Sequence, residues 1–294
     1  MPGVKSQIVF ITGAAGGIGA EVARRLHRNG ANLVLIDLDE ASLTALAGEL
    51  GDDQRLLTVV ADVRDLAAMQ AAADTAVQRF GGIDVVIANA GIASYGSLLQ
   101  VDPAVFKRVM DINLLGVFHT VRAALPAVAQ RRGYVLIVSS LAAFAGFPGM
   151  VPYATSKAGV EQLANALRLE VAHLGVGVGS AHMSWIDTAL VRDTEADLPA
   201  VRANRAKRSW SPLSKITPVD KCAAAFVKGI EGRKNRIYCP RWVGLFRWLK
   251  PVLSTSAGES AIRKTTPELL PRIDVEVAAL GRSTSARTEA LEAR

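Results

Sequence analysis

The sequence predicts an α/β fold in which helices cover both faces of a doubly wound parallel sheet. Apolar runs of strand length alternate with longer helical segments over most of the chain, and this alternation is typical of βαβ units. Most of the strand-like runs are apolar without a break, as strands buried on both faces should be. A glycine follows four of the helical segments, at positions 30, 51, 81 and 175, where a left-handed residue ends a helix at little cost.

The order of the predicted elements supports this fold class. Strands are expected at residues 7–12, 32–37, 56–61, 84–88, 133–139 and 176–182. Helices are expected at residues 17–29, 40–50, 65–80, 103–129 and 152–174. Residues 186–216 are polar and basic, and we expect a loop or short helices lying over a site. A last helix at 218–231 and a short strand at 236–239 complete the sheet.

Composition excludes several classes of protein. A chain of 294 residues, half of them hydrophobic and 21% charged, is long and apolar enough to bury a large core, so a disordered protein is excluded. Two cysteines are too few for a disulfide framework, and no C-x-x-C or His/Cys cluster offers a metal site. We therefore expect no metal and a reduced, cytoplasmic compartment. No uninterrupted apolar run reaches the roughly 18 residues of a membrane-spanning helix, and the run at 8–11 is too short for a signal peptide.

The net charge of +7 is concentrated in the last third of the chain. Residues 1–100 hold 7 Lys and Arg against 11 Asp and Glu, whereas residues 201–294 hold 19 against 8. An electrostatic footprint must lie on the surface that binds. The basic balance therefore gives no reason to expect nucleic-acid binding by the main domain.

A glycine-rich turn follows the first predicted strand and opens the first helix. It reads TGAAGGIG at positions 12–19. Glycines let the backbone approach a pyrophosphate, and the N–H groups and dipole of a helix N-terminus favour an anion. Such turns also serve plain helix–strand packing, but the strand before and the helix after favour a dinucleotide site.

The second strand ends at Asp37, 18 residues beyond Gly19. This is close to the spacing of roughly 20 residues at which an acid binds the adenosine ribose hydroxyls. A carboxylate there repels the 2′-phosphate of NADP, so NAD is favoured over NADP. The alternative is an exposed loop acid, and Arg24 or Arg25 on the first helix could instead meet a phosphate.

Tyr153 and Lys157 stand four residues apart, one turn along the same helix face. A free tyrosine titrates at about 10, and a nearby positive charge lowers that pKa. We expect Lys157, helped by an oxidised nicotinamide ring, to supply this charge. Ser140 ends a strand-like run 13 residues before Tyr153, so the two hydroxyls could converge on one substrate oxygen. The alternatives are a surface Tyr/Lys pair and a simple turn at Ser140.

These motifs together resemble the short-chain dehydrogenase/reductase family. The resemblance is carried by the turn at 12–19, Asp62-Val63, Asn89-Ala90-Gly91, Asn113, Ser140 and Tyr153-x-x-x-Lys157, and it extends over about residues 5–190 and more weakly to 240. It implies a one-domain Rossmann fold with about seven parallel strands. It also implies a nicotinamide cofactor and hydride transfer between that cofactor and an alcohol or carbonyl.

The resemblance assigns catalytic roles to four residues. Tyr153 is the general acid/base, Lys157 holds the nicotinamide ribose and tunes the tyrosine, Ser140 polarises the substrate oxygen, and Asn113 keeps a water in the proton relay. The residues expected to bind the cofactor are Gly13, Gly17, Ile18, Gly19, Asp37, Asp62, Val63, Asn89, Gly91, Tyr153, Lys157, Ile186 and Thr188.

The cofactor contacts have particular places. The resemblance puts Asp62 and Val63 at the adenine, Asn89 by the ribose, and Ile186 and Thr188 at the carboxamide. Each residue has a structural alternative: a helix cap for Asp62, turn formers for the Asn89 motif, and a satisfied core amide for Asn113.

Two positions depart from the family pattern. Ala88 replaces the first residue of the usual Asn-Asn-Ala-Gly, and Met183-Ser184 replaces the usual Pro-Gly after the sixth strand. The first change removes a structural hydrogen bond. The second adds side chains beside the nicotinamide face.

Large apolar side chains follow the catalytic motifs on loops expected to line the substrate pocket. They are Phe144, Phe147, Met150, Val151, Trp185 and Leu190. They suit an apolar secondary alcohol or its ketone, although some could simply pack the core. A basic cluster, Arg202, Arg205, Lys207 and Arg208, could bind an acidic tail such as a carboxylate or coenzyme A. That alternative is an NADPH-type reductase of acyl-carrier-bound β-ketones, and a further one is a non-catalytic dinucleotide-binding regulatory protein.

The pattern changes after residue 240, so residues 1–240 are expected to form the Rossmann-type catalytic domain and residues 241–294 a C-terminal amphipathic helix and tail. On a helix over 241–253, apolar residues form a stripe along one side, and Arg247 and Lys250 lie on the opposite side. The stripe consists of Trp242, Leu245, Phe246, Leu249 and Leu253. It predicts peripheral contact at the inner face of a membrane, or else a cover over the substrate mouth or an oligomer interface.

Two further expectations concern the chain end and the assembly. Residues after about 254 are expected to form a loosely ordered tail. The family resemblance implies a homodimer or homotetramer through the helices that begin near Pro103 and Pro152.

Overall fold

A seven-stranded parallel sheet forms the centre of the protein in the computed structural model, which describes residues 3–51 and 54–293. The strands are β1 (Ile8–Thr12), β2 (Asn32–Asp37), β3 (Leu56–Val60), β4 (Val85–Ala88), β5 (Tyr134–Val138), β6 (Gly177–Met183) and β7 (Arg236–Cys239). Their order is β3-β2-β1-β4-β5-β6-β7, and neighbouring strands are parallel. The predicted fold class and its seven strands are confirmed. The order reverses between β1 and β4, where a doubly wound sheet opens a crevice at its carboxyl edge.

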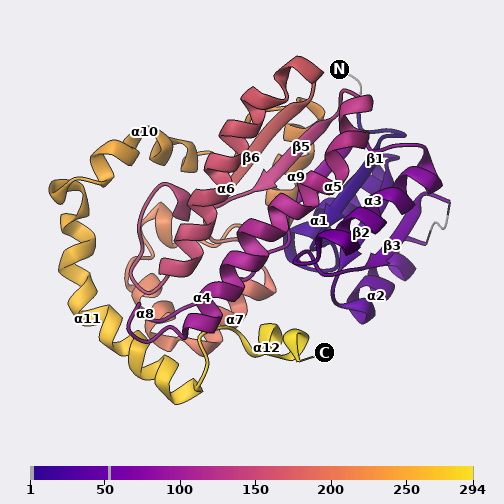
Figure 1. Cartoon of the computed structure of the whole chain (residues 1–294). Helices are drawn as coiled ribbons and strands as arrows, with labels where there is room; N and C mark the ends of the chain where they lie inside the picture. The colour runs from indigo at the N-terminus through magenta and orange to yellow at the C-terminus, as the bar shows by residue number, and fades with distance from the viewer. Residues whose placement is uncertain (1–2, 52–53, 294) are drawn as a thin grey trace.

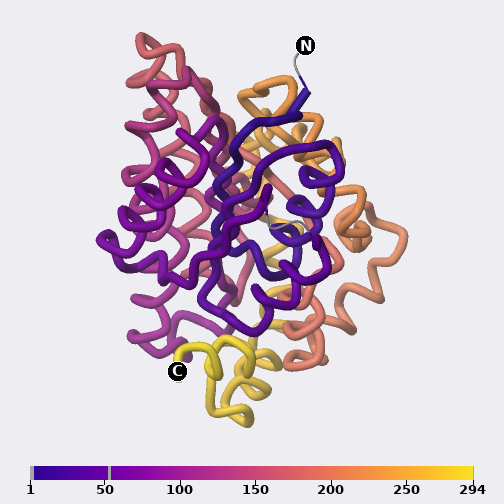
Figure 2. Tube along the Cα trace, turned by 90° about the vertical axis from the view of Figure 1, so that its right-hand side faces the viewer, coloured from indigo at the N-terminus to yellow at the C-terminus, as the bar shows by residue number. Residues whose placement is uncertain are grey.

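Helices cover both faces of the sheet (Figure 1 and Figure 2). One face carries α1 (Gly17–Arg28), α2 (Glu40–Leu50) and α9 (Val219–Glu231), and the other carries α3 (Leu66–Phe80), α5 (Gly116–Gln130) and α6 (Val151–Glu170). Side chains alternate between these two cores: in β1, Val9 and Ile11 join the first, and Ile8 and Phe10 join the second. Burial on both faces is why the strands are apolar without alternation in the sequence.

The predicted helix at 103–129 is one continuous helical run with an irregular middle. It consists of α4 (Pro103–Met110), a π-helical turn at Asp111–Leu115, and α5. The run is long and apolar enough to cross a membrane, with a mean hydropathy of 1.4, but half of that stretch is buried inside the protein. Its inner face packs in the second core, so it is a core helix of this fold.

The loop region at 186–216 contains short helices, as predicted. These are α7 (Ala189–Asp197) and α8 (Pro199–Lys207), followed by a short 3-10 turn at Pro212–Ser214. Two further 3-10 turns lie outside this region, at Leu141–Ala143 and Ala172–Leu174.

The expectation of a loosely ordered tail after residue 254 is wrong. Beyond α10 (Val243–Leu253), the chain forms α11 (Ser256–Leu280) and α12 (Ala286–Glu292). In Figure 1, α10 and α11 form an arch beside the main body, and α12 returns beneath it. Ile273 and Val277 of α11 are buried against Tyr95 and Leu198. The arch therefore has a hydrophobic contact of its own with the sheet domain.

Candidate active site

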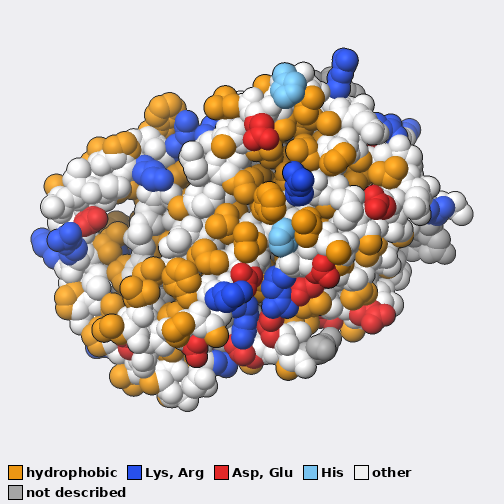
Figure 3. All heavy atoms as spheres, viewed as in Figure 1, with side chains coloured by type: hydrophobic (Ala, Val, Ile, Leu, Met, Phe, Trp, Pro, Cys, Tyr) orange, Lys and Arg blue, Asp and Glu red, His pale blue; other side chains and the backbone are white. Residues whose placement is uncertain are grey.

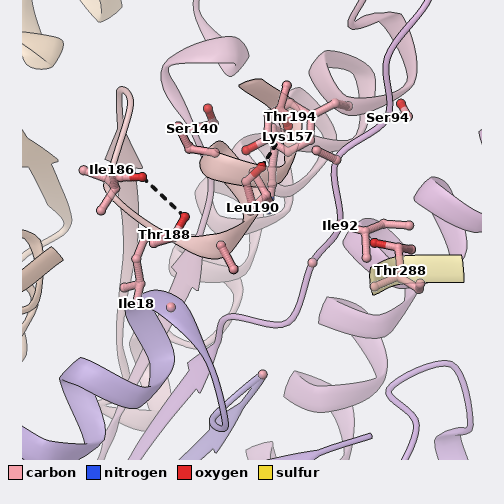
Figure 4. Close-up of a pocket in the computed structure, with 18 of the residues that line it drawn as sticks. Ile18, Ile92, Ser94, Ser140, Lys157, Ile186, Thr188, Leu190, Thr194 and Thr288 are labelled. Carbon is pink, nitrogen blue, oxygen red and sulfur yellow. Dashed lines mark hydrogen bonds between the residues drawn. The ribbon is translucent and has the colours of Figure 1, made fainter. Parts of the chain in front are cut away.

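One cavity of about 570 Å³ lies over the crevice at the carboxyl ends of the strands. The glycine-rich turn, the ends of β2, β4 and β5, the start of α6, and α7 line it. Residues of α11 and α12 complete its wall. Figure 4 shows Ile18 near Thr188 on one side, Ser140 and Lys157 at the upper end, and Thr288 of α12 on the opposite side. This is where a doubly wound sheet binds its ligand.

The glycine-rich turn is shaped by close backbone contacts. Gly13 and Gly17 have φ angles of +63° and +52°, a region that glycine enters at no steric cost. A Cβ atom on Gly13 would lie 2.8 Å from the Ala90 Cα, and one on Gly19 would lie 2.1 Å from the Gly13 oxygen. A Cβ on Gly16 would meet nothing within 4 Å. The turn therefore leaves an open cradle on its cavity side, which fits the pyrophosphate of a dinucleotide.

Asn89 fixes this turn from the neighbouring strand end. Its side-chain amide donates to the carbonyl oxygens of Thr12 at 3.1 Å and Gly13 at 2.9 Å. Asn89, Gly13, Gly17 and Ile18 line the cavity, whereas Gly19 is absent from the wall. Gly19 thus has a packing role behind the turn.

Asp37 lies on the cavity wall at the end of β2. Its carboxylate accepts hydrogen bonds from the backbone N–H of Ala15 at 2.8 Å and of Asp39 at 3.1 Å. The acid is thus held against the glycine-rich turn, so the reading as a plain loop acid is not supported.

The two helix arginines considered as phosphate partners are engaged elsewhere. Arg24 makes two hydrogen bonds of 2.8 Å to the Glu49 carboxylate, and Arg25 lies 3.3 Å from Glu21. Neither arginine lines the cavity.

Asp62 and Val63 line the cavity, and Asp62 is tied to the end of the chain. The Asp62 carboxylate accepts hydrogen bonds of 2.8 Å from the backbone N–H and the Nε of Arg64. Burial would raise the pKa of Asp62, but these hydrogen bonds hold it below its ordinary value. Arg64 also lies 2.7 Å from Glu292 of α12, so α12 borders this end of the cavity. The N-cap of α3 is Asp65, which rules out that role for Asp62.

Ser140, Tyr153 and Lys157 all line the cavity, as predicted. Ser140 follows β5 and accepts a hydrogen bond from the N–H of Ala142 at 3.2 Å, which fixes the strand end. Tyr153 and Lys157 lie on α6, with the Lys157 Nζ 5.7 Å from the centre of the tyrosine ring. Nζ also donates to the carbonyl of Val138 at 3.1 Å.

Burial and one hydrogen bond act on the pKa of Tyr153 in opposite directions. Burial raises it above its ordinary value, and a hydrogen bond with Ser140 opposes that rise. Burial lowers the pKa of Lys157 to about 8, because the apolar surroundings disfavour the ammonium. Among the described residues, the Ser140 hydroxyl lowers the pKa of Tyr153 and so favours the phenolate.

Asn113 lies behind the cavity, in the π-helical turn, and is fully buried. Its amide nitrogen donates to the Ile92 carbonyl at 2.9 Å and to Ser156 Oγ at 3.1 Å, and its oxygen accepts from the Ile92 N–H at 2.8 Å. A Cβ on Gly91 would lie 3.1 Å from this oxygen and 3.4 Å from the Lys157 Nζ. The side chain thus joins the loop after β4 to α6, and its part in a proton relay stays a prediction.

A buried histidine supports Ser140 from behind and was not predicted. The His182 Nδ1 lies 3.2 Å from the Ser140 carbonyl oxygen, and its Nε2 lies 2.8 Å from the Glu161 carboxylate. Burial would raise the pKa of Glu161, but hydrogen bonds from His182 and Ser180 lower it to about 2. The only signal in the sequence is Glu161 itself, one turn beyond Lys157 on the same helix face.

The segment after β6 forms the wall opposite the glycine-rich turn. Ile186 and Thr188 line the cavity, and the Thr188 hydroxyl donates to the Ile186 carbonyl at 3.3 Å (Figure 4). Met183 and Ser184, the departures from Pro-Gly, also line it. The Ser184 Oγ is buried and has no hydrogen-bond partner in the part of the chain that the structure describes.

Four of the six predicted apolar pocket residues line the cavity, and two do not. Phe147, Met150, Trp185 and Leu190 are on the wall. Phe144 instead stacks on His182 at 4.4 Å between ring centres, and Val151 is exposed at the start of α6. The wall also contains apolar residues that were not predicted: Leu198, Val201, Leu213, Leu269, Ile273 and Leu291.

None of the four basic residues expected to hold an acidic tail lines the cavity. Arg205 contacts Glu195 and donates to the Ser214 carbonyl at 3.0 Å. Lys207 lies 3.7 Å from Glu268. Two members of the cluster are thus committed to contacts within the chain.

Comparison with known proteins agrees with this geometry. The family model for short chain dehydrogenases matches residues 7–199. A (−)-trans-carveol dehydrogenase of Rhodococcus erythropolis is 36% identical over 211 residues, which cover 66% of this chain and 76% of that protein.

Solved structures that are similar to this chain include dehydrogenases and reductases. A short chain dehydrogenase/reductase of Burkholderia phymatum in complex with NAD is similar with a TM-score of 0.73 at 25% identity, over 84% of this chain and 94% of that chain. A 3-ketoacyl-(acyl-carrier-protein) reductase of Brucella melitensis complexed with NADH has a TM-score of 0.69 at 25% identity, over 80% and 97%. The chain belongs to the short-chain dehydrogenase/reductase family and is an NAD(P)-dependent oxidoreductase acting on CH–OH groups.

Proposed function

We propose that this protein transfers a hydride between NAD and an apolar secondary alcohol or its ketone, with Tyr153 as the general acid/base. The observation that carries the proposal is the arrangement of one cavity. Asp37 and the glycine-rich turn form one end, Ser140, Tyr153 and Lys157 lie on its wall, and apolar side chains such as Phe147, Met150, Leu269 and Ile273 form much of the remainder.

The negative charge of Asp37 supports a preference for NAD over NADP. The Asp37 carboxylate is held at the mouth of the glycine-rich turn, where it would accept hydrogen bonds from ribose hydroxyls and repel a 2′-phosphate. Arg24 is bound to Glu49 and is not free to neutralise such a phosphate.

The chain's own residues supply the proton chemistry. A bound nicotinamide supplies the hydride acceptor or donor, and its oxidised ring adds a positive charge. Ser140 and Tyr153 hold the substrate oxygen, and Tyr153 takes its proton during oxidation or returns it during reduction. The ammonium of Lys157 is fixed by the Val138 carbonyl, and it would hold the nicotinamide ribose of a bound cofactor. Asn113 holds the loop at Ile92 against α6 through hydrogen bonds to Ile92 and Ser156.

The walls favour an apolar substrate with few polar groups. Phe147, Met150, Leu269 and Ile273 carry no charge, and no residue of the basic cluster lines the cavity. Ser94 and Ser184 each place a buried hydroxyl, unpartnered within the described residues, on the cavity wall. They suit a single additional oxygen on the substrate. The similarity to a carveol dehydrogenase supports an alcohol carried on an apolar ring.

The reductase of acyl-carrier-bound β-ketones is the second candidate. It is favoured by the similarity to a 3-ketoacyl-(acyl-carrier-protein) reductase. It is disfavoured by the position of the basic cluster, since Arg205 and Lys207 are committed to Glu195 and Glu268.

We also propose a homodimer or homotetramer formed through α5 and α6, in the cytoplasm. Figure 3 shows hydrophobic atoms gathered over these two helices. Leu115 of the π-helical turn, Phe118 of α5 and Leu169 of α6 are 46%, 45% and 80% exposed. Burying such a patch against a second copy would remove it from water. The two cysteines are free and buried, as suits a reducing compartment.

The test is an oxidation screen with NAD and NADP supplied separately. The alcohols should include cyclic, steroid, retinoid and long-chain secondary alcohols, with a β-hydroxyacyl thioester as the competing substrate. We expect turnover of apolar secondary alcohols with NAD. Turnover of the thioester alone would favour the second candidate, and cofactor binding without any turnover would favour a regulatory protein.

A further inference from the structure

The outward face of α10 is apolar, and it shares Leu245 and Leu249 with the stripe that the sequence predicts. Leu245, Trp248, Leu249 and Val252 are 62%, 75%, 45% and 57% exposed. Their spacing of three, four and seven residues places them on one side of the helix. We call these four residues the α10 ridge. Trp242 and Phe246, predicted for the same stripe, contact each other at 5.8 Å between ring centres and are only half-buried.

The α10 ridge does not cover the cavity. No residue of α10 is among the described residues that line it, and that role belongs to Leu269 and Ile273 of α11. The first turn of α10 is anchored, because Val243 is fully buried and Gly244 packs against the Tyr238 ring. In Figure 1 the rest of the helix stands away from the sheet at the top of the arch. The reading of this helix as a cover for the substrate mouth is therefore not supported.

The stretch of chain that contains the ridge is basic and has no acidic residue. Between Glu231 and Glu259 the chain has no acidic residue and six basic ones. The Arg247 guanidinium lies 4.8 Å from the centre of the Trp248 ring, and neither it nor the exposed Lys250 pairs with an acid in the described part of the chain. Figure 3 shows hydrophobic and basic atoms side by side over α10. A complementary surface would be both apolar and anionic.

A second copy of the chain does not meet this requirement. A twofold dimer through the α10 ridge would bring two copies of this basic stretch together, and the stretch has no acidic residue to offset the charge. A bilayer that contains anionic lipid does meet it. Its headgroups attract Arg and Lys, and its interface accepts tryptophan and leucine side chains from a helix that lies in the plane of the membrane.

We infer that the α10 ridge docks this protein on the surface of an anionic lipid bilayer. The docking uses no residue of the cavity, so it is independent of the reaction that the cavity performs. Its salt dependence follows from the basic side chains. Its strength follows from the apolar area that the ridge buries.

The test is co-sedimentation of the full chain with vesicles of phosphatidylcholine alone or mixed with phosphatidylglycerol. The ridge variant is L245S/W248S/L249S. The matched control is L98S/L99S/W210S, which also changes two leucines and one tryptophan, exposed at 63%, 99% and 83%, away from α10. A third variant, R247E/K250E, reverses the charge and keeps the apolar ridge. NAD binding and circular dichroism show that each variant is folded.

We expect the unchanged protein and the matched control to bind the anionic vesicles and to bind pure phosphatidylcholine weakly. The ridge variant should bind the anionic vesicles at least about tenfold more weakly, since it lacks three side chains that docking would bury. R247E/K250E should lose the preference for anionic lipid, and about 0.5 M salt should weaken binding of the unchanged protein. Tryptophan fluorescence should shift to the blue on binding in the control and not in the ridge variant.

Three results would overturn the inference. The first is that the unchanged protein shows no preference for anionic vesicles at low salt. The second is equal binding by the ridge variant and the matched control. The third is that the ridge variant changes the sedimentation velocity of the assembly while vesicle binding is absent throughout, which would identify the ridge as a subunit contact.

Discussion

The ammonium of Lys157 lies 5.7 Å from the centre of the Tyr153 ring, one helical turn away, and is held by the carbonyl of Val138 at 3.1 Å. Burial acts on the two groups in opposite directions. It raises the pKa of the phenol and lowers that of the ammonium to about 8. Because both shifts favour the neutral forms, the residues near this pair decide how readily Tyr153 gives up its proton.

Lys157→Gln should change how stability depends on pH. The pKa of Lys157 is lowered by burial to about 8, so between about pH 8 and 10 the unfolded chain binds more protons at this residue than the folded one. The free energy of unfolding of the unchanged protein should therefore rise relative to that of the variant over this window, by roughly 2 kcal/mol. Denaturant unfolding of both proteins at several pH values measures it. If the difference in unfolding free energy between the two proteins does not change with pH, the pKa of Lys157 is not lowered in the folded protein.

Ser140→Ala should move the pH profile of turnover. The Ser140 hydrogen bond lowers the pKa of Tyr153, so its loss should raise that pKa. The acidic limb of kcat/KM for alcohol oxidation should then shift to higher pH, and the maximal rate should fall because the substrate oxygen loses one of its two hydroxyl partners. An unchanged profile would show that Ser140 does not act on Tyr153.

Asp37→Ala should raise KM for NAD by about tenfold and bring NADP closer to it, since a hydrogen-bond acceptor and a repulsive charge are lost together. Glu40→Ala is the matched control, because Glu40 is an exposed acid three residues away that does not line the cavity. Titration of both cofactors against the three proteins decides the matter. Tighter binding of NADP than of NAD by the unchanged protein would refute the assignment of Asp37.

Removal of the chain from Ser285 onward should speed the release of the reduced cofactor. α12 has no buried residue, so its loss should leave the fold intact. It does contact the cavity end at Asp62 through the 2.7 Å pair between Glu292 and Arg64, and Glu289 lies 3.1 Å from Arg108. Stopped-flow displacement of NADH should show a rise of a few-fold, roughly what one or two partly exposed ion pairs contribute. Equal release rates would assign α12 no role at the cofactor.

The sequence predicted the sheet well because its strands are buried on both faces. β1 is apolar from Ile8 to Ile11 and β2 from Leu33 to Ile36, and the glycine-rich turn after β1 has a spacing that few other structures use. Ser140, Tyr153 and Lys157 were predictable for the same reason: each is placed by the end of a strand or by one helical turn.

The errors have physical causes too. α11 was missed because Pro267 and Pro271 interrupt its pattern, yet a helix packed along one side tolerates the loss of two backbone hydrogen bonds. Its apolar residues recur at helical spacing from Ile262 to Leu280, and this is the signal that could have revealed it. Phe144 was misplaced because its partner, the His182 ring, comes from a strand far along the chain. The boundary at residue 240 stays a prediction, since Ile273 of α11 packs against Tyr95 of the sheet domain.

The most direct test of the proposed reaction is the rate of NADH formation by Tyr153→Phe with an apolar secondary alcohol that the unchanged protein oxidises. The ring still packs on α6 in this variant and only the hydroxyl is lost. The rate should fall by about 10²–10⁴-fold, while the dissociation constant for NAD, measured by fluorescence, should stay within about twofold because Lys157 and the glycine-rich turn are unchanged. Turnover at the unchanged rate would contradict the assignment of Tyr153 as the acid/base, and with it the proposed mechanism.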